Sequence, residues 1–241
     1  MFKHIGNSRT YEHNLKIASL LSFVAGIVNV AGFLAVQRLT TNVTGHFAFF
    51  VDEVFKLEFL EGFIYFLYIL SFFLGSFTSS LIVEIISRKN NNLVYVIPVI
   101  IESIILFSVA VFGQFLISHN PNLLAFSLLF AMGLQNSLVT TISNAIVRTT
   151  HLTGLFTDLG IELSQLFFYK LKEQKEKLYS SIKLRLTIIS FFFFGGLFGG
   201  TFYSTIKLYV LVIAGAVLLI GIIYDDIKLR LLHKSSRIYN G

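Results

Sequence analysis

Long apolar stretches separated by short polar segments run along the chain of 241 residues. A helix needs about 20 apolar residues to cross the hydrocarbon core of a bilayer. Six stretches come close to this length, near residues 17–36, 62–86, 93–117, 122–147, 186–205 and 208–224. None of them alternates apolar and polar residues with the period of two that is typical of transmembrane β-barrel strands. The pattern predicts an all-α integral membrane protein with six transmembrane helices.

The composition agrees with a membrane protein, since 55% of the residues are hydrophobic and only 13% are charged, against roughly 25% charged residues in soluble domains. Lys3, Arg9 and Lys16 precede the first apolar stretch, as basic residues do in a signal peptide. That stretch is too long for a signal peptide and no small-residue cleavage site follows it, so we expect it to remain as the first helix. The absence of cysteine excludes disulfides and thiolate metal sites.

The basic residues indicate which segments lie in the cytoplasm, because basic loops are retained there. When the segments between spans are assigned alternately to two sides, one side holds only three of the 19 Lys and Arg residues, namely Arg38, Lys56 and Lys207. Both termini are therefore predicted to be cytoplasmic, with 225–241 as a cytoplasmic tail. This topology and the attraction of anionic lipid head groups explain the net charge of +6. The expected partner is the lipid bilayer and not nucleic acid.

Two parts of the chain repeat each other. The segment 40–45 (TTNVTG) resembles 149–154 (TTHLTG), and each is preceded by a Gly-x-x-Asn, with Gly26 and Asn29 in the first copy and Gly133 and Asn136 in the second. The chain is therefore interpreted as one membrane domain, 1–241, that contains two three-helix repeats, 15–117 and 122–224. Three helices is an odd number, so the second repeat has inverted topology. Such repeats place a substrate site near the membrane midplane and favour transport.

Small residues recur in the third matching segment, where 73–79 (FLGSFTS) resembles 194–200 (FGGLFGG). Small residues four positions apart allow helix backbones to approach closely in a membrane. The glycines at 195, 196, 199 and 200 would also permit a homodimer.

The stretches FLAVQRLTTNVTGHFAFFVD (33–52) and MGLQNSLVTTISNAIVRTTHLTGLFTDLGIELSQL (132–166) resemble the YoaK-like family of bacterial membrane proteins, which is filed under a domain of unknown function. The resemblance covers nearly the whole chain. It implies a six-span protein of the bacterial inner membrane, and it supplies no established substrate or activity.

A polar stripe is predicted on the fourth helix, because Asn136, Thr140, Asn144 and Arg148 recur every four residues. The stripe could line an aqueous path or a substrate site, or it could provide hydrogen bonds between helices. The repetition of Asn29 at the equivalent place favours the lining role.

Each Thr-Gly segment reads as the start of a broken or re-entrant helix, with threonine as the expected cap and an amphipathic stretch after it, 47–60 or 155–168. The start of a helix suits a carboxylate or another anion. One hypothesis is that Thr44, Gly45, Thr153 and Gly154 bind substrate near the pseudo-twofold axis. The alternative is that they are ordinary turn and cap residues at the membrane surface.

Three acidic residues are candidates for proton coupling. Glu102 lies well inside the third span, where an ionisable side chain is costly and normally faces the interior of the bundle. Asp158 and Glu162 are one helical turn apart, and His151 precedes them. These types could serve a proton relay or a divalent metal, but no third or fourth ligand is evident, so no metal site is predicted. A neutral, hydrogen-bonded carboxyl is the alternative for Glu102.

The leading interpretation is a secondary transporter of a small solute by alternating access, with proton coupling as a further hypothesis. A passive channel and a structural or signalling membrane protein remain alternatives. An intramembrane enzyme is disfavoured because the sequence has neither a Gly-x-Ser-x-Gly turn nor a His-Glu-x-x-His motif. It also has no Gly-rich nucleotide-binding loop, and no cofactor is predicted.

Overall fold

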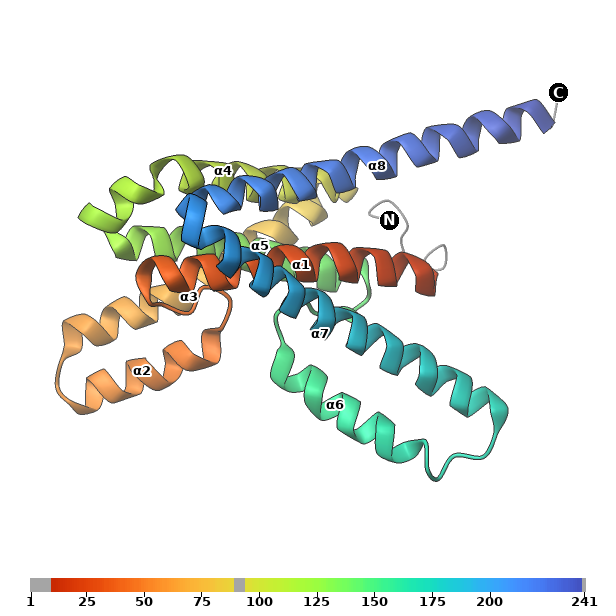
Figure 1. Cartoon of the computed structure of the whole chain (residues 1–241), viewed down its shortest axis with the longest axis horizontal. Coiled ribbons are helices and arrows are strands. Elements are labelled where there is room, and N and C mark those ends of the chain that lie inside the picture. Colours follow the sequence, from red (N-terminus) through yellow and green to blue (C-terminus); the bar gives the residue numbers. More distant parts are fainter. Residues whose placement is uncertain (1–9, 89–93, 240–241) are drawn as a thin grey trace.

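The computed structural model describes residues 10–88 and 94–239, and this part of the chain is helical, with no β-strand (Figure 1). The helices are α1 (Tyr11–Val36), α2 (Val43–Phe55), α3 (Phe59–Ser87), α4 (Val96–His119), α5 (Pro121–Ile142), α6 (Leu152–Gln165), α7 (Lys172–Ile206), the 3-10 turn η2 (Lys207–Tyr209) and α8 (Val210–Tyr239). The basic residues Lys3, Arg9 and Lys89 lie outside the described residues.

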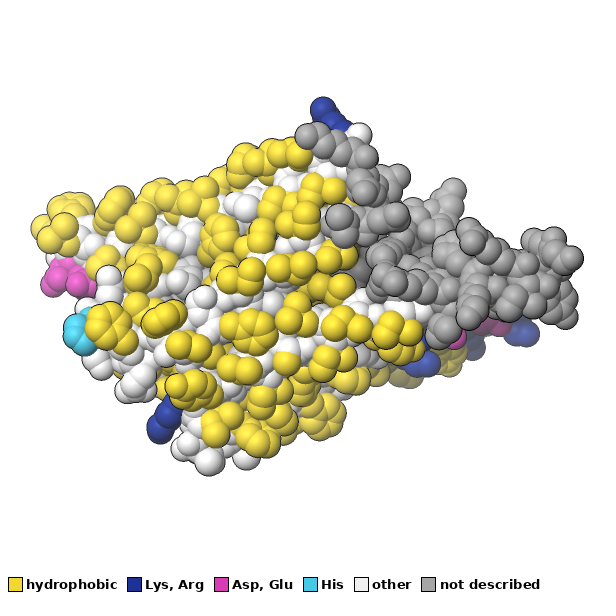
Figure 2. Space-filling view, turned by 90° about the horizontal axis from the view of Figure 1, so that it is seen from above, with side chains coloured by type: hydrophobic (Ala, Val, Ile, Leu, Met, Phe, Trp, Pro, Cys, Tyr) yellow, Lys and Arg dark blue, Asp and Glu magenta, His cyan; other side chains and the backbone are white. Residues whose placement is uncertain are grey.

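Five helical segments of the described chain are long and apolar enough to cross a membrane. The fifth segment, Lys172–Asp225, contains α7, η2 and the beginning of α8, and so includes both the fifth and the sixth predicted spans. Apolar side chains also cover the outside of the helices, as Phe73, Phe112 and Phe193 are each more than half exposed. Figure 2 shows one such face, on which charged side chains are confined to the ends of the described surface. The prediction of an all-α chain with the features of a multi-pass membrane protein is confirmed.

The predicted limits of the fourth span were wrong at its C-terminal end. Helix α5 ends at Ile142, not near residue 147. Asn144 and Ala145 have left-handed backbones, with φ of 52° and 63°, and such a conformation cannot continue a right-handed helix. The polar stripe predicted from Asn136 to Arg148 is therefore broken after Thr140. Helix α8, in contrast, continues through most of the predicted tail, to Tyr239.

The two short helices α2 and α6 begin beside the middle of longer helices and run away from each other in Figure 1. After α1 ends, the chain turns back, and the Thr40 hydroxyl donates a 3.2 Å hydrogen bond to the carbonyl of Val28 in α1. Asn42 caps α2, since its Oδ1 accepts the backbone N–H of Gly45 at 3.1 Å. The prediction of a threonine cap was wrong, and in α6 the N-cap residue His151 makes no side-chain cap.

Two helix pairs pack with their backbones close together, α1 against α7 and α3 against α5. A methyl group placed on Gly26 of α1 would lie 2.7 Å from the backbone nitrogen of Gly196 in α7. A methyl group placed on Gly133 of α5 would lie 3.0 Å from the backbone nitrogen of Ser76 in α3. The small residues therefore allow both pairs to pack at a distance that no other residue permits.

Candidate solute cavity

A cavity of about 750 Å³ lies where the two short helices begin. Its walls come from both helix pairs and from both Thr-Gly segments. It is lined by Asn29, Leu39, Thr41, Asn42, Val43, Thr44, Gly45, Ala48, Phe72, Asn136, Thr140, Arg148, Thr150, His151, Leu152, Thr153 and Phe192. Six of the eight residues predicted to bind substrate therefore line one space: Asn29, Thr44, Gly45, Asn136, Thr140 and Thr153.

Each asparagine hydrogen-bonds to the turned-back segment of its own copy, Asn29 as the acceptor and Asn136 as the donor to the equivalent threonine. The Thr41 hydroxyl donates to Asn29 Oδ1 at 2.7 Å, and Asn136 Nδ2 donates to the Thr150 hydroxyl at 2.7 Å. The Asn136 Oδ1 also accepts from Thr149, at 3.4 Å. The amide nitrogen of Asn29 has no hydrogen-bond partner within the described ranges. Both asparagines thus position the backbone, and the two N–H groups of the Asn29 amide stay without a partner among the described residues.

The turns before the short helices are fixed by local contacts. Gln37, directly after α1, has a φ of 53°, which ends that helix and reverses the chain. The ring of His46, buried in α2, makes a 2.6 Å hydrogen bond through Nε2 to the carbonyl of Leu39 and lies 4.9 Å from the Tyr68 ring. On the other side, Ser143 Oγ accepts the backbone N–H of Val147 at 2.9 Å.

These turns bring the first residues of α2 and α6 to the cavity wall. The first N–H groups of a helix have no partner within the helix and carry a partial positive charge. The hydroxyls of Thr44 and Thr153 make no hydrogen bond with the rest of the described chain. The polar part of the wall therefore presents mainly hydrogen-bond donors and adaptable hydroxyl groups, and apolar side chains such as Phe72 and Phe192 form the rest.

Arg148 lines the cavity, but the sequence prediction placed it on the wrong element. It was assigned to the stripe on the fourth helix, but it follows the end of α5 in a non-helical turn and reaches the cavity from there. Its guanidinium has no ion pair or hydrogen bond with any other described residue. No Asp or Glu lines the cavity, so Arg148 gives the space a positive character.

Two aromatic residues of the wall were not among the predicted site residues. Phe72 of α3 and Phe192 of α7 face the cavity from the two helix pairs. Phe72 lies three residues before Gly75, and Phe192 lies three residues before Gly195. This equal spacing is the signal that could have identified them.

Asn144 and Gly154 do not line this cavity. Asn144 is exposed in the turn after α5, where its left-handed backbone directs it away from the stripe. Gly154 lines an adjacent hollow of about 510 Å³, which shares Arg148 and His151 with the main cavity.

Asp158 and Glu162 lie outside the main cavity and pair with Arg185 of α7. Arg185 donates from Nε and from an Nη to the two oxygens of Glu162, both at 2.9 Å, and its other Nη lies 2.8 Å from Asp158. A bidentate contact of this kind ties α6 to α7. Within the described ranges, no three His, Cys, Asp or Glu residues are grouped so that they could hold a metal.

Glu102 is completely buried in α4, and neither carboxyl oxygen has a hydrogen-bond partner in the described part of the chain. The next residue, Ser103, donates to the Val99 carbonyl at 2.8 Å and lies 3.5 Å from the Gly215 carbonyl of α8. Glu102 is therefore part of the buried surface of α4, and it does not line the cavity.

A family model described as "Protein of unknown function (DUF1275)" matches residues 17–224. The match covers most of the chain, so the protein belongs to this family, and the resemblance drawn from the Thr-Gly stretches is confirmed. No significant match was found among curated proteins or among solved structures.

Proposed function

We propose that this member of the DUF1275 family is a secondary transporter that moves a small solute across the bacterial inner membrane by alternating access. The observation that carries the proposal is the cavity of about 750 Å³, to which Asn29 and Asn136 contribute from equivalent sequence motifs. A mostly apolar cavity whose polar groups are amides, hydroxyls, Arg148 and two helix starts suits the reversible binding of a polar group. The distribution of Lys and Arg supports cytoplasmic termini.

Matching contacts support the proposal that the chain has six spans in two inverted repeats, 15–117 and 122–224. Asn29 holds Thr41 as Asn136 holds Thr150, both at 2.7 Å. The glycine that precedes each asparagine packs on the long helix that follows the other Thr-Gly segment. Each half thus supplies one helix to each close pair, in the way that two intertwined copies of one unit would.

The arrangement of pairs suggests how access would alternate. Within a pair, backbone contacts at glycine leave little room for movement, so α1–α7 and α3–α5 act as two rigid bodies. The cavity lies between these bodies, since Asn29 and Phe192 come from one and Phe72 and Asn136 from the other. Rocking of one body against the other would open the cavity first to one side and then to the other.

Glu102 is the proposed proton carrier. Its carboxyl group is buried in α4 without a partner in the described part of the chain, and α4 lies outside the two rigid bodies. An ionised carboxylate is costly in such a place, so movement of this helix would change its charge. A Glu102→Gln protein should lose the response of transport to a pH gradient. Transport that still follows the gradient in this variant would remove Glu102 from the mechanism.

The first test uses the natural absence of cysteine. Asn29→Cys and Asn136→Cys proteins, in vesicles of both orientations, are treated with a membrane-impermeant maleimide, and Gly160→Cys on the exposed face of α6 serves as the control. Alternating access predicts that both cavity positions react from both sides, in proportions that change with pH. Complete protection from both sides would refute the proposal. Flux that rises linearly with solute concentration, without saturation, would favour the passive channel.

A further inference from the structure

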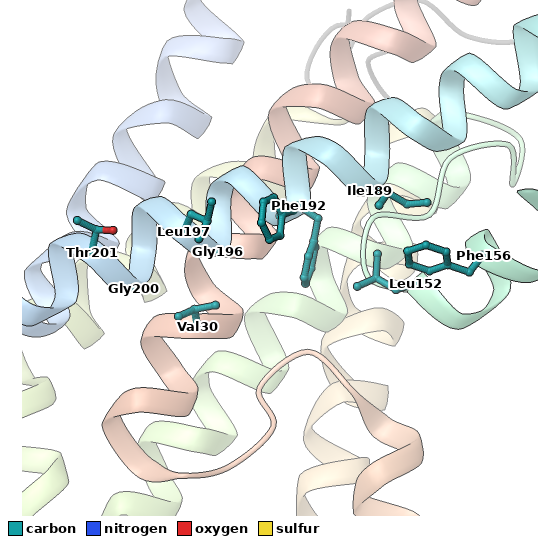
Figure 3. A pocket seen from close by; sticks show the side chains of 10 residues that line it. Val30, Leu152, Phe156, Ile189, Phe192, Gly196, Leu197, Gly200 and Thr201 are labelled. Carbon is teal, nitrogen blue, oxygen red and sulfur yellow. The ribbon is translucent and has the colours of Figure 1, made fainter.

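An apolar groove of about 590 Å³ adjoins the cavity (Figure 3). Its walls are Val30 of α1, Leu152 and Phe156 of α6 and one face of α7, from Ile189 to Thr201. Gly196 and Gly200 leave the side of α7 open there. Apart from the hydroxyl of Thr201, the side chains that line the groove carry no polar group.

The groove and the cavity are neighbours, because Leu152 and Phe192 form part of the wall of both. On one side of these two residues lies the unpaired guanidinium of Arg148, together with the N–H groups of Asn29 and of two helix starts. On the other side lies the apolar groove. A ligand that fills both spaces must carry a negatively charged polar end and a hydrocarbon chain.

We propose that the solute is a single-chain amphiphilic monoanion, with its anionic group at Arg148 and its hydrocarbon chain in the groove. This inference rests on the proposed function and names the class of solute that it moves. Arg148 is the single permanent charge on the cavity wall, which matches one negative charge on the ligand. The groove runs along one helix, α7, which suits one chain rather than the two chains of a phospholipid.

The contributions of the charged end and of the hydrocarbon chain to the binding affinity can each be estimated. A guanidinium hydrogen-bonded to an anion contributes an affinity factor of at least about tenfold. Each methylene that leaves water for the groove contributes about a further fourfold, until the groove is full. Neither the polar end nor the chain alone should bind tightly.

The experiment measures binding, not uptake, to the purified full-length protein by its thermal unfolding. Decanesulfonate is the probe, because it stays charged at all relevant pH values and does not cross a bilayer as a neutral acid. Methanesulfonate lacks the chain, and decyltrimethylammonium carries the same chain with the opposite charge. We expect saturable stabilisation by decanesulfonate and none by the other two compounds.

Two variants locate the ligand. Arg148→Gln should weaken decanesulfonate binding at least tenfold, and Arg88→Gln, at the end of α3, should leave it unchanged. Gly200→Leu should block the groove, because a Cβ added at this position would lie only 3.3 Å from the Val30 side chain. If Gly200→Leu fails to fold, Phe156→Ser tests the same wall at a position that is 58% exposed.

Equal stabilisation by decanesulfonate and decyltrimethylammonium would overturn the inference, because the charge of Arg148 would then play no part. A co-purified two-chain phospholipid that decanesulfonate does not displace would overturn it as well. Saturable uptake of a small hydrophilic solute without any decanesulfonate binding would refute this inference and leave the transporter proposal standing. Decanesulfonate binding with no saturable uptake of any solute would refute the transporter proposal and leave the amphiphile site standing.

Discussion

Replacing Gly26 by alanine tests the close contact between α1 and α7. The new methyl group would lie 2.7 Å from the backbone nitrogen of Gly196 and 3.0 Å from the carbonyl carbon of Phe192. These atoms belong to the backbone of α7, which cannot turn aside as a flexible side chain can. Helices α1 and α7 must therefore separate, and overpacking of this kind costs about 1–3 kcal/mol.

The control is Gly160→Ala in α6, where nothing lies within 4 Å of the new methyl group. Both substitutions gain the same helix propensity, up to about 1 kcal/mol, so their difference isolates the clash at α7. For a chain of this size about 2–4 °C corresponds to 1 kcal/mol. The melting temperature of Gly26→Ala should therefore lie roughly 2–12 °C below that of Gly160→Ala.

Circular dichroism of the two proteins in the same detergent measures this difference. If they melt at the same temperature, α1 and α7 do not approach at Gly26. The pairing of α1 from the first half with α7 from the second half, called here the crossed pairing, would then be wrong. The rocking mechanism would lose one of its two rigid bodies.

Three further predictions concern the surroundings of the cavity. Arg185→Gln removes the bidentate partner of Glu162, which is only 13% exposed, and should lower the free energy of unfolding by about 1–3 kcal/mol; an unchanged melting temperature would mean that α6 is not tied to α7. Burial lowers the pKa of His46 in the folded protein. As the pH drops below about 6.5, the imidazole is therefore protonated in the unfolded chain before it is protonated in the folded one, and the free energy of unfolding falls. His46→Gln should melt with a weaker dependence on pH between 7 and 5, and an identical dependence would show that another group is responsible. Thr150→Val removes the 2.7 Å contact with Asn136 and should cost about 1 kcal/mol; an unchanged melting temperature would show that the contact does not hold the segment.

Apolar length and motif repetition in the sequence were sufficient to predict the helices and most of the cavity wall. The length rule works because a bilayer leaves a hydrophobic chain few alternatives to a helix. Asn29 lies 12 residues before Thr41 and Asn136 lies 14 residues before Thr150, so the two motifs recur at nearly the same spacing in each copy. These features depend on residues that are close together in the sequence.

Other features depend on backbone geometry or on distant contacts, and the sequence could not predict them. Nothing local in the sequence forces Asn144 and Ala145 into left-handed conformations, yet they end α5 and carry Arg148 to the cavity by another route. The pairing of α1 with α7 joins residues far apart in the chain, and Gly26 gives no indication of which helix it will face. The apolar groove exists only because that pairing brings α1, α6 and α7 together.

The crossed pairing has a consequence for the order in which the protein is made. Helix α1 is complete at Val36, whereas its close partner α7 is complete only at Ile206. At a synthesis rate of about 5–20 residues per second, α1 waits roughly 10–35 s before that partner exists. During this interval the side of α1 that contains Gly26 faces lipid, the insertion machinery or another nascent chain. Two copies made side by side could exchange their first helices, so faithful assembly depends on how each unfinished chain is kept apart from its neighbours.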